Sequence, residues 1–225
     1  MKVVSWNMNK RKEGCWEWLL NSHHPDFVMA QEASPLLNGM KATVRTTTKK
    51  TNRTVFYSQD RTHKHVKMEH DGGMGLLVCE NKSIYFINIY ANLDFKPVNP
   101  SLLGYICKFV SNLKRRHNAV HILIAGDFNM DRRMDENPTG SVFAAKGTYP
   151  TNDFFDAILD MGFSDCVRKY IKDPIQTHYH RRSKFPWELD HMFATDELYD
   201  ALTQITVPET QNLSDHNPII ATFDF

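Results

Sequence analysis

The chain has 225 residues, of which 41% are hydrophobic and 24% are charged, and its formal net charge at pH 7 is +1. This composition is ordinary for a globular protein that buries a substantial core. No run approaches the roughly 18 apolar residues that span a bilayer, and the polar start of the chain does not fit a signal peptide. We therefore expect neither a membrane-spanning segment nor a signal peptide.

Cysteine spacing bears on the compartment. The four cysteines lie far apart and form no C-x-x-C pair; they are Cys15, Cys79, Cys107 and Cys166. This pattern predicts buried free thiols in a reducing compartment, while two disulfides remain an alternative. We expect a cytoplasmic monomer that does not bind membranes.

Positive charge is concentrated in one segment. Residues 41–67 hold eight lysines or arginines and one acid, a net charge of +7 that leaves −6 for the rest of the chain. A basic segment on a nearly neutral body is typical of local contact with a polyanion. Lys49, Lys50 and Arg53 are therefore candidate substrate-binding residues. A solvated hairpin with lysine-rich edges is the alternative.

Two strands and a helix are predicted at the start of the chain. Residues 2–8 alternate loosely and predict a strand, and the apolar stripe in residues 13–21 predicts an amphipathic helix. Residues 27–30 form a buried run that ends abruptly in Gln31 and Glu32. The carboxyl end of a buried strand is where open α/β sheets display their ligands.

The next region favours β structure. Residues 43–58 are rich in Thr, Val, Phe and Tyr and predict a hairpin that carries the basic side chains. Further predicted elements are strands at 63–69, 75–80 and 83–90 and a helix at 102–116, whose basic end suits the helix dipole.

The central stretch is Ala125-Gly126-Asp127-Phe128-Asn129-Met130, which follows the apolar run 119–124. A buried strand that stops at a glycine predicts a displayed site. In an extended chain Asp127 and Asn129 would point to the same side, with Phe128 anchored in the core. A carboxylate beside an amide donor suits hydrolysis at phosphorus. An Asx turn that caps the strand explains the same residues equally well.

The remaining elements complete one domain. A polar loop at 131–150 is long enough to indicate function, and a helix follows at 151–161. Closing strands are predicted at 176–182, 189–194, 202–207 and 219–225. Because no repeat or linker interrupts residues 1–225, we expect a single domain. Alternating strands with helices between them favour a layered α/β sandwich over a purely parallel doubly wound sheet.

Polar side chains recur at the predicted strand ends. The motifs are Ser5-Trp6-Asn7, Gln31-Glu32, Gly126-Asp127-Phe128-Asn129, Leu189-Asp190-His191 and Ser214-Asp215-His216. In this order they resemble the endonuclease/exonuclease/phosphatase superfamily, and they reach from residue 5 to residue 216. The resemblance implies a four-layer α/β/β/α sandwich of two mixed β-sheets flanked by helices.

The resemblance also implies a metal-dependent phosphodiesterase with Mg²⁺, or Mn²⁺ in its place. Glu32 would be the chief metal ligand, with Asn7 beside it and Asp215 contributing directly or through water. The implied catalytic residues are Asp127, which orients or deprotonates the attacking water; Asn129, which binds a phosphoryl oxygen; His216, held by Asp190; and Tyr90, which contacts the phosphate. Whether Asp127 or the histidine takes the water's proton stays open. Asn9 stands where apurinic endonucleases carry an aspartate, so a second metal ligand is in doubt.

Nucleic acid, with DNA favoured over RNA, is the expected substrate. His178 and Arg181, from the predicted strand 176–182, are further candidates for binding its phosphates. A phosphatase or phosphodiesterase of the same superfamily acting on an inositol phosphate, a lipid head group or a nucleotide is the alternative. Tyr90 disfavours it, because many phosphatase branches carry a histidine there. A binding protein that kept the fold without catalysis is disfavoured by the complete set of implied catalytic residues.

Overall fold

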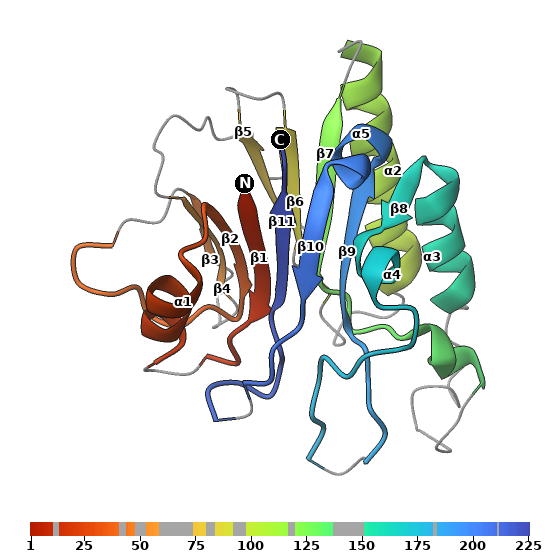
Figure 1. Cartoon of the computed structure of the whole chain (residues 1–225). Coiled ribbons are helices and arrows are strands. Elements are labelled where there is room, and N and C mark those ends of the chain that lie inside the picture. Colours follow the sequence, from red (N-terminus) through yellow and green to blue (C-terminus); the bar gives the residue numbers. More distant parts are fainter. Residues whose placement is uncertain are drawn as a thin grey trace.

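Two β-sheets lie face to face at the centre of the computed structural model (Figure 1). The structure describes residues 1–10, 14–40, 44–47, 53–58, 74–79, 84–91, 98–116, 120–136, 151–181, 184–210 and 212–225. For residues 44–47, 53, 74–79 and 98–101 only the backbone is described. No described helix is both long and apolar enough to cross a membrane.

The first sheet carries the N-terminal strand near its middle. Its strands run in the order β10 (Leu202–Thr206), β11 (Ile219–Phe223), β1 (Lys2–Asn7), β2 (Phe27–Gln31), β4 (Arg53–Ser58) and β3 (Val44–Thr47). The β1–β2 pair is parallel and matches Asn7 with Gln31, whereas the other pairs are antiparallel. Both parallel strands therefore deliver polar residues to the same edge of the sheet.

The second sheet presents a matching edge. Its order is β5 (Met74–Cys79), β6 (Ile84–Tyr90), β7 (His121–Asp127), β9 (Asp190–Thr195) and β8 (Phe163–Asp165). The parallel pair β6–β7 sets Tyr90 opposite Asp127, and the antiparallel strand β9 starts with Asp190 opposite the same aspartate. Three polar side chains thus meet at the end of the central strand.

Helices cover the outer faces of the two sheets and complete four layers (Figure 1). Helix α1 (Cys15–His23) packs on the first sheet, while α2 (Val98–Arg116) and α3 (Thr151–Asp160) pack on the second. Shorter elements are η2 (Arg132–Glu136), α4 (Cys166–Tyr170) and α5 (Asp196–Asp200). The predicted sandwich of two mixed sheets flanked by helices is confirmed.

Strand alternation explains the layering. In β1, Val3 joins the core between the sheets and Val4 joins the core beneath α1. In β6, Phe86 faces the other sheet and Ile87 faces the outer helices. Because successive side chains of a strand point to opposite faces, runs that are apolar throughout fill two cores at once.

The sequence predictions differ from the local structure in several places. A strand was predicted at 176–182, but the described residues 176–181 form none. Only His178 makes β-bridges, one to Trp187 and one to His216, because this segment does not run alongside a single strand. Strand β8 and helix α4 were not predicted. The segment 131–150, predicted as a loop, contains the short helix η2. Helix α4 has only five residues and depends on its cap, since Asp165 accepts bonds from two of its amides. The predicted strand 63–69 lies outside the described residues.

Candidate active site

The polar strand ends meet at one cavity of about 380 Å³. It is lined by Asn7, Asn9, Glu32, Tyr90, Asp127, Asn129, Met134, His178, His180, Trp187, Leu189, Asp215 and His216. Most of the predicted site residues therefore share one cavity, although they come from both sheets and from the segments before β9 and β11. Two groups of side chains in and beside this cavity differ in character, and we call them the histidine end and the glutamate end.

The histidine end consists of Asp127, Asp190 and His216. The Nδ1 atom of His216 lies 2.8 Å from Oδ2 of Asp190, and its Nε2 atom lies 4.0 Å from Oδ2 of Asp127. All three residues are buried. Since the Asp190 carboxylate accepts the Nδ1 proton, it fixes the ring orientation and leaves Nε2 facing Asp127.

Burial and charge set the protonation of this end in opposite ways. Burial alone would lower the pKa of His216, but the negative charges of Asp190 and Asp127 and the hydrogen bond to Asp190 outweigh it and raise the pKa to about 9. Burial raises the pKa of Asp127 to about 7, although the charge of His216 and bonds from Asn7 and Asn129 act against this shift. At neutral pH the imidazole is therefore cationic, and Asp127 titrates in the working range.

Asp127 and Asn129 reach the cavity through a turn. The amide N–H of Asn129 donates to Oδ1 of Asp127 (2.9 Å), and Asn129 has a φ of 51°. The expected extended arrangement is wrong and the Asx turn is present, because this bond curls the chain as β7 ends. The Asn129 side chain still approaches Oδ2 of Asp127 (3.3 Å), to which the Asn7 amide also donates (2.9 Å).

Gly126 allows the strands to come close at this point. Its φ is 149°, and a Cβ atom there would lie 1.9 Å from the carbonyl oxygen of Ile89 in β6. Only glycine fits such an approach without displacing the backbone of the neighbouring strand.

The glutamate end consists of Lys10, Glu32 and Tyr90. The Tyr90 hydroxyl donates to Oε1 of Glu32 (2.6 Å), and Nζ of Lys10 lies 3.2 Å from Oε2. Glu32 has a φ of 42°, in the left-handed region that L residues seldom adopt. Strain of this kind persists where the surrounding structure fixes the backbone, which occurs often at functional sites.

A buried amide pair ties the two sheets together just below this end. Nε2 of Gln31, the residue before Glu32, donates to Oδ1 of Asn88 (2.6 Å) in β6. Asn88 in turn donates to the backbone oxygen of Ala30 (3.2 Å). These bonds hold the end of β2 against the end of β6 and so fix Glu32 relative to Tyr90.

The donor set of the cavity fits a hard divalent cation. Glu32, Asn7 and Asp215 offer oxygen atoms, and Oδ1 of Asp215 is buried without a hydrogen-bond partner among the described residues. Oxygen ligands are those that Mg²⁺ prefers, usually together with several waters. The residues expected from the sequence to hold a metal are therefore compatible with one.

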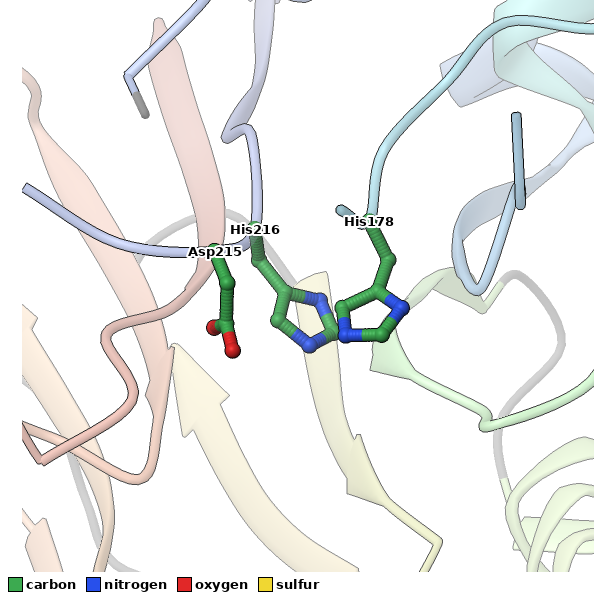
Figure 2. Close-up of side chains that lie close together, drawn as sticks. All are labelled: His178, Asp215 and His216. Atoms are coloured by element: carbon green, nitrogen blue, oxygen red, sulfur yellow. The ribbon is translucent and has the colours of Figure 1, made fainter. Parts of the chain in front are cut away.

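His178 lies directly against the histidine end. Its ring centroid is 4.4 Å from that of His216, and one ligand atom from each of His178, Asp215 and His216 lies within 4.8 Å of the others (Figure 2). Burial, together with the charge of His216, lowers the pKa of His178 to about 4, so its ring is neutral at pH 7.

The other predicted binding residues are placed differently. Arg181 is exposed and does not line the cavity, because residues 176–181 form no strand that would direct it inward. Lys49 and Lys50 lie outside the described residues, and of Arg53 only the backbone, in β4, is described.

Sequence reasoning missed Lys10, Met134 and Trp187. Trp187 stands three residues before Asp190, and that proximity was the only signal available for it. Lys10 approaches Glu32 because Asn9 and Lys10 both have positive φ values, which turn the chain back toward β2. No short-range pattern in the sequence predicts this turn.

Comparisons with known proteins identify the family of the chain. Residues 4–216 match the model of the Endonuclease/Exonuclease/phosphatase family, and the chain belongs to this family of divalent-metal-dependent hydrolases. No curated protein sequence matches the chain.

Several solved structures share the fold. An AP endonuclease from Archaeoglobus fulgidus is 20% identical, with a TM-score of 0.77 and 100% of both chains covered. The 3′ phosphatase NExo from Neisseria, bound to a product DNA hairpin, is 20% identical, with a TM-score of 0.76 over 100% of both chains. The endonuclease domain of TRAS1, a telomere-specific non-LTR retrotransposon, is 16% identical, with a TM-score of 0.73 and coverage of 100% of this chain and 98% of that one.

Proposed function

We propose that this protein is a metal-dependent phosphodiesterase that hydrolyses nucleic acid, with DNA favoured over RNA. The observation that carries the proposal is the single cavity in which a carboxylate-held imidazole and an Asp–Asn pair face a glutamate–tyrosine pair. Hydrolysis at phosphorus needs a proton acceptor for water, donors aimed at the phosphoryl oxygens and an anionic site for a cation. The two ends of the cavity supply these groups.

Asp127 takes the proton of the attacking water. At neutral pH the imidazole of His216 carries both of its protons, because Asp190 stabilises the cation, and it therefore has no lone pair with which to accept another. Asp127 has a pKa of about 7, so a large fraction is ionised and able to accept a proton. Asp127 is therefore our proposed proton acceptor, out of the two groups that the sequence left open.

His216 and Asn129 bind the phosphoryl oxygens. The Nε2–H of the His216 cation faces the cavity and donates to a non-bridging oxygen, while its charge offsets the negative charge that builds there. Asn129 contributes a neutral amide beside it. Asp190 acts through His216, by keeping the ring charged and correctly oriented.

Glu32, with Asn7 and Asp215, would hold Mg²⁺, and Mn²⁺ in its place. When bound, the cation supplies Lewis-acid stabilisation of charge on the phosphate oxygens. The Tyr90 hydroxyl orients the Glu32 carboxylate and lies where it also meets the phosphate.

Two features favour a polynucleotide over a small ester. Structural relatives include an AP endonuclease and a phosphatase bound to a DNA hairpin, and the +7 segment at 41–67 offers cations for phosphates on either side of the cut. The second candidate, a phosphatase acting on a small ester, is supported by the relative that is itself a 3′ phosphatase.

A substrate panel tests the proposal. Labelled single- and double-stranded DNA and RNA oligonucleotides, a 3′-phosphorylated DNA and inositol phosphates would each be incubated with Mg²⁺ and with chelator. We expect Mg²⁺-dependent cleavage of DNA that is lost in the His216→Ala variant. Release of phosphate from small esters without cleavage of any oligonucleotide would replace the nuclease assignment with the phosphatase one.

A further inference from the structure

A second group of metal ligands lies beside the proposed Mg²⁺ site. His178, Asp215 and His216 each offer one ligand atom, and these three atoms lie within 4.8 Å of one another (Figure 2). The group contains two imidazoles and one carboxylate, whereas the glutamate end offers only oxygen ligands. Imidazole ligands favour zinc and other late first-row metals over magnesium.

One carboxylate oxygen of this group lacks a partner. Oδ1 of Asp215 is buried without a hydrogen bond to any described residue. Buried polar atoms are nearly always satisfied, so an exception calls for a partner such as an ion or an ordered water. Nε2 of His178 is the ring nitrogen that faces His216 and Asp215, whereas its Nδ1 lies on the far side of the ring (Figure 2). An ion held between Asp215 and the two imidazoles would supply the missing partner.

The third ligand is already oriented for metal binding. Nδ1 of His216 is bonded to Asp190 at 2.8 Å, which leaves Nε2 as the atom that faces the cavity. A carboxylate on the far nitrogen is the usual support for a zinc-binding histidine, because it fixes the tautomer and increases the basicity of the ligand atom.

Backbone pairing holds the cluster in place. Tyr179 N–H donates to the oxygen of Asp215 (2.8 Å), and Asn217 N–H donates to the oxygen of Thr177 (2.8 Å). On the other side, His178 N–H donates to the oxygen of Trp187 (3.0 Å). The segments that carry the three ligands are thus fixed side by side.

We propose that His178, Asp215 and His216 form a binding site for a zinc-like transition-metal ion, which lies next to the Mg²⁺ site at the glutamate end and shares Asp215 with it. Three protein ligands leave a fourth position open toward the cavity. An ion bound there displaces the proton of Nε2 of His216 into solvent and occupies the atom assigned above to the phosphate, and it therefore inhibits hydrolysis. Metal binding stands independently, whereas the inhibition rests on the proposed function.

Calorimetric titration with ZnCl₂, without substrate, tests the site. We expect one strong Zn²⁺ site per chain in the unaltered protein, weakened at least about tenfold by His178→Phe, which keeps a ring of similar size without a ligand atom. His180→Gln is the matched control: His180 lines the same cavity outside the cluster, so Zn²⁺ affinity should not change. The cysteines are common to all variants and cannot cause a difference between them.

Asp215 belongs to both proposed donor sets, whereas Glu32 and His178 each belong to one. Glu32→Gln should therefore weaken Mn²⁺ binding and leave Zn²⁺ binding intact, and His178→Phe should do the reverse. Co²⁺ as a spectroscopic probe should give the intense visible bands of a tetrahedral site, absent in His178→Phe. If His178→Phe does not fold, as judged by circular dichroism, His178→Gln provides the same comparison.

Equal Zn²⁺ affinity in the unaltered protein and His178→Phe would overturn the proposal, as would loss of Zn²⁺ binding in Glu32→Gln alone. Inhibition of oligonucleotide cleavage by equimolar Zn²⁺ in excess Mg²⁺, relieved by chelator, is the expected functional consequence. If the protein cleaves no oligonucleotide, the proposed function fails while the calorimetric result still decides the metal site.

Discussion

The two ends of the cavity differ in how completely the protein assembles them. At the histidine end, the side chains of Asp127, Asp190 and His216 are 2%, 1% and 7% exposed. At the glutamate end, the side chains of Lys10 and Glu32 are 46% and 16% exposed. The histidine end is therefore preorganised by burial, and the glutamate end is open to exchange one cation for another. We expect substitutions at the first end to impair turnover and those at the second to change metal affinity.

The largest effect is expected at the Asp190–His216 pair. His216→Ala and Asp190→Asn should each lower kcat by about 10³-fold. His216→Ala removes the hydrogen-bond donor to the phosphate, and Asp190→Asn removes the carboxylate that keeps His216 charged and oriented. The double variant should be little worse than either single one. Single-turnover rates of all three with a labelled oligonucleotide measure this, and multiplicative losses would show that the two residues act independently.

A pH profile follows from the same pair. The active form has His216 protonated, so activity should be present below its raised pKa and be lost as pH rises through about 9. On the acid side, activity should fall as Asp127 becomes protonated below about 7. Asp190→Asn removes the charge that raises the His216 pKa, and its alkaline limb should move down toward the ordinary value of 6.5. An alkaline limb at the same pH in both proteins would contradict the assignment.

Substrate affinity is expected to depend on the basic segment. Replacing Lys49, Lys50 and Arg53 by Gln should raise KM for an oligonucleotide, reduce the slope of its salt dependence by up to roughly 2–3 and leave kcat nearly unchanged. A small model diester should be hydrolysed at the same rate. Normal oligonucleotide binding at every salt concentration would identify the segment as a solvated hairpin and favour the small-ester alternative.

A smaller effect is expected from Lys10, which competes with a metal ion for Glu32. Lys10→Gln should tighten Mn²⁺ binding, because it removes the cation that pairs with Glu32. The effect should be only about two- to fivefold, because an exposed ion pair contributes little free energy. Electron paramagnetic resonance of free Mn²⁺ measures the affinity. Lys114→Gln, which alters a lysine at the end of α2 bonded to the Met161 carbonyl, is the control. Weaker Mn²⁺ binding in Lys10→Gln would show that Lys10 supports the site.

The alternation of strands and helices along the sequence favoured a layered α/β sandwich, and the family resemblance implied the four-layer arrangement. The pattern wrongly predicted a strand at 176–181, where the composition is strand-like but the chain pairs with no single strand. It missed α4, which has only five residues and depends on the capping side chain of Asp165. The site was predictable where a polar residue ends a buried strand, as at Glu32 and Asp127. It was not predictable where a left-handed turn folds the chain back, as at Lys10. His178 and His216 were both expected in the site, but their direct contact was not, because it depends on the pairing of two loops.

Mg²⁺ titration of oligonucleotide cleavage in the unaltered protein, Glu32→Ala and His216→Ala tests the central contrast most directly. Glu32→Ala should lose most of its activity at ordinary Mg²⁺ and regain part of it at high Mg²⁺, because the cation has lost its chief anionic ligand. His216→Ala should show a greatly reduced maximal rate with an unchanged half-saturating Mg²⁺ concentration. Full activity of Glu32→Ala at ordinary Mg²⁺, or rescue of His216→Ala by added Mg²⁺, would contradict the division of roles between the two ends.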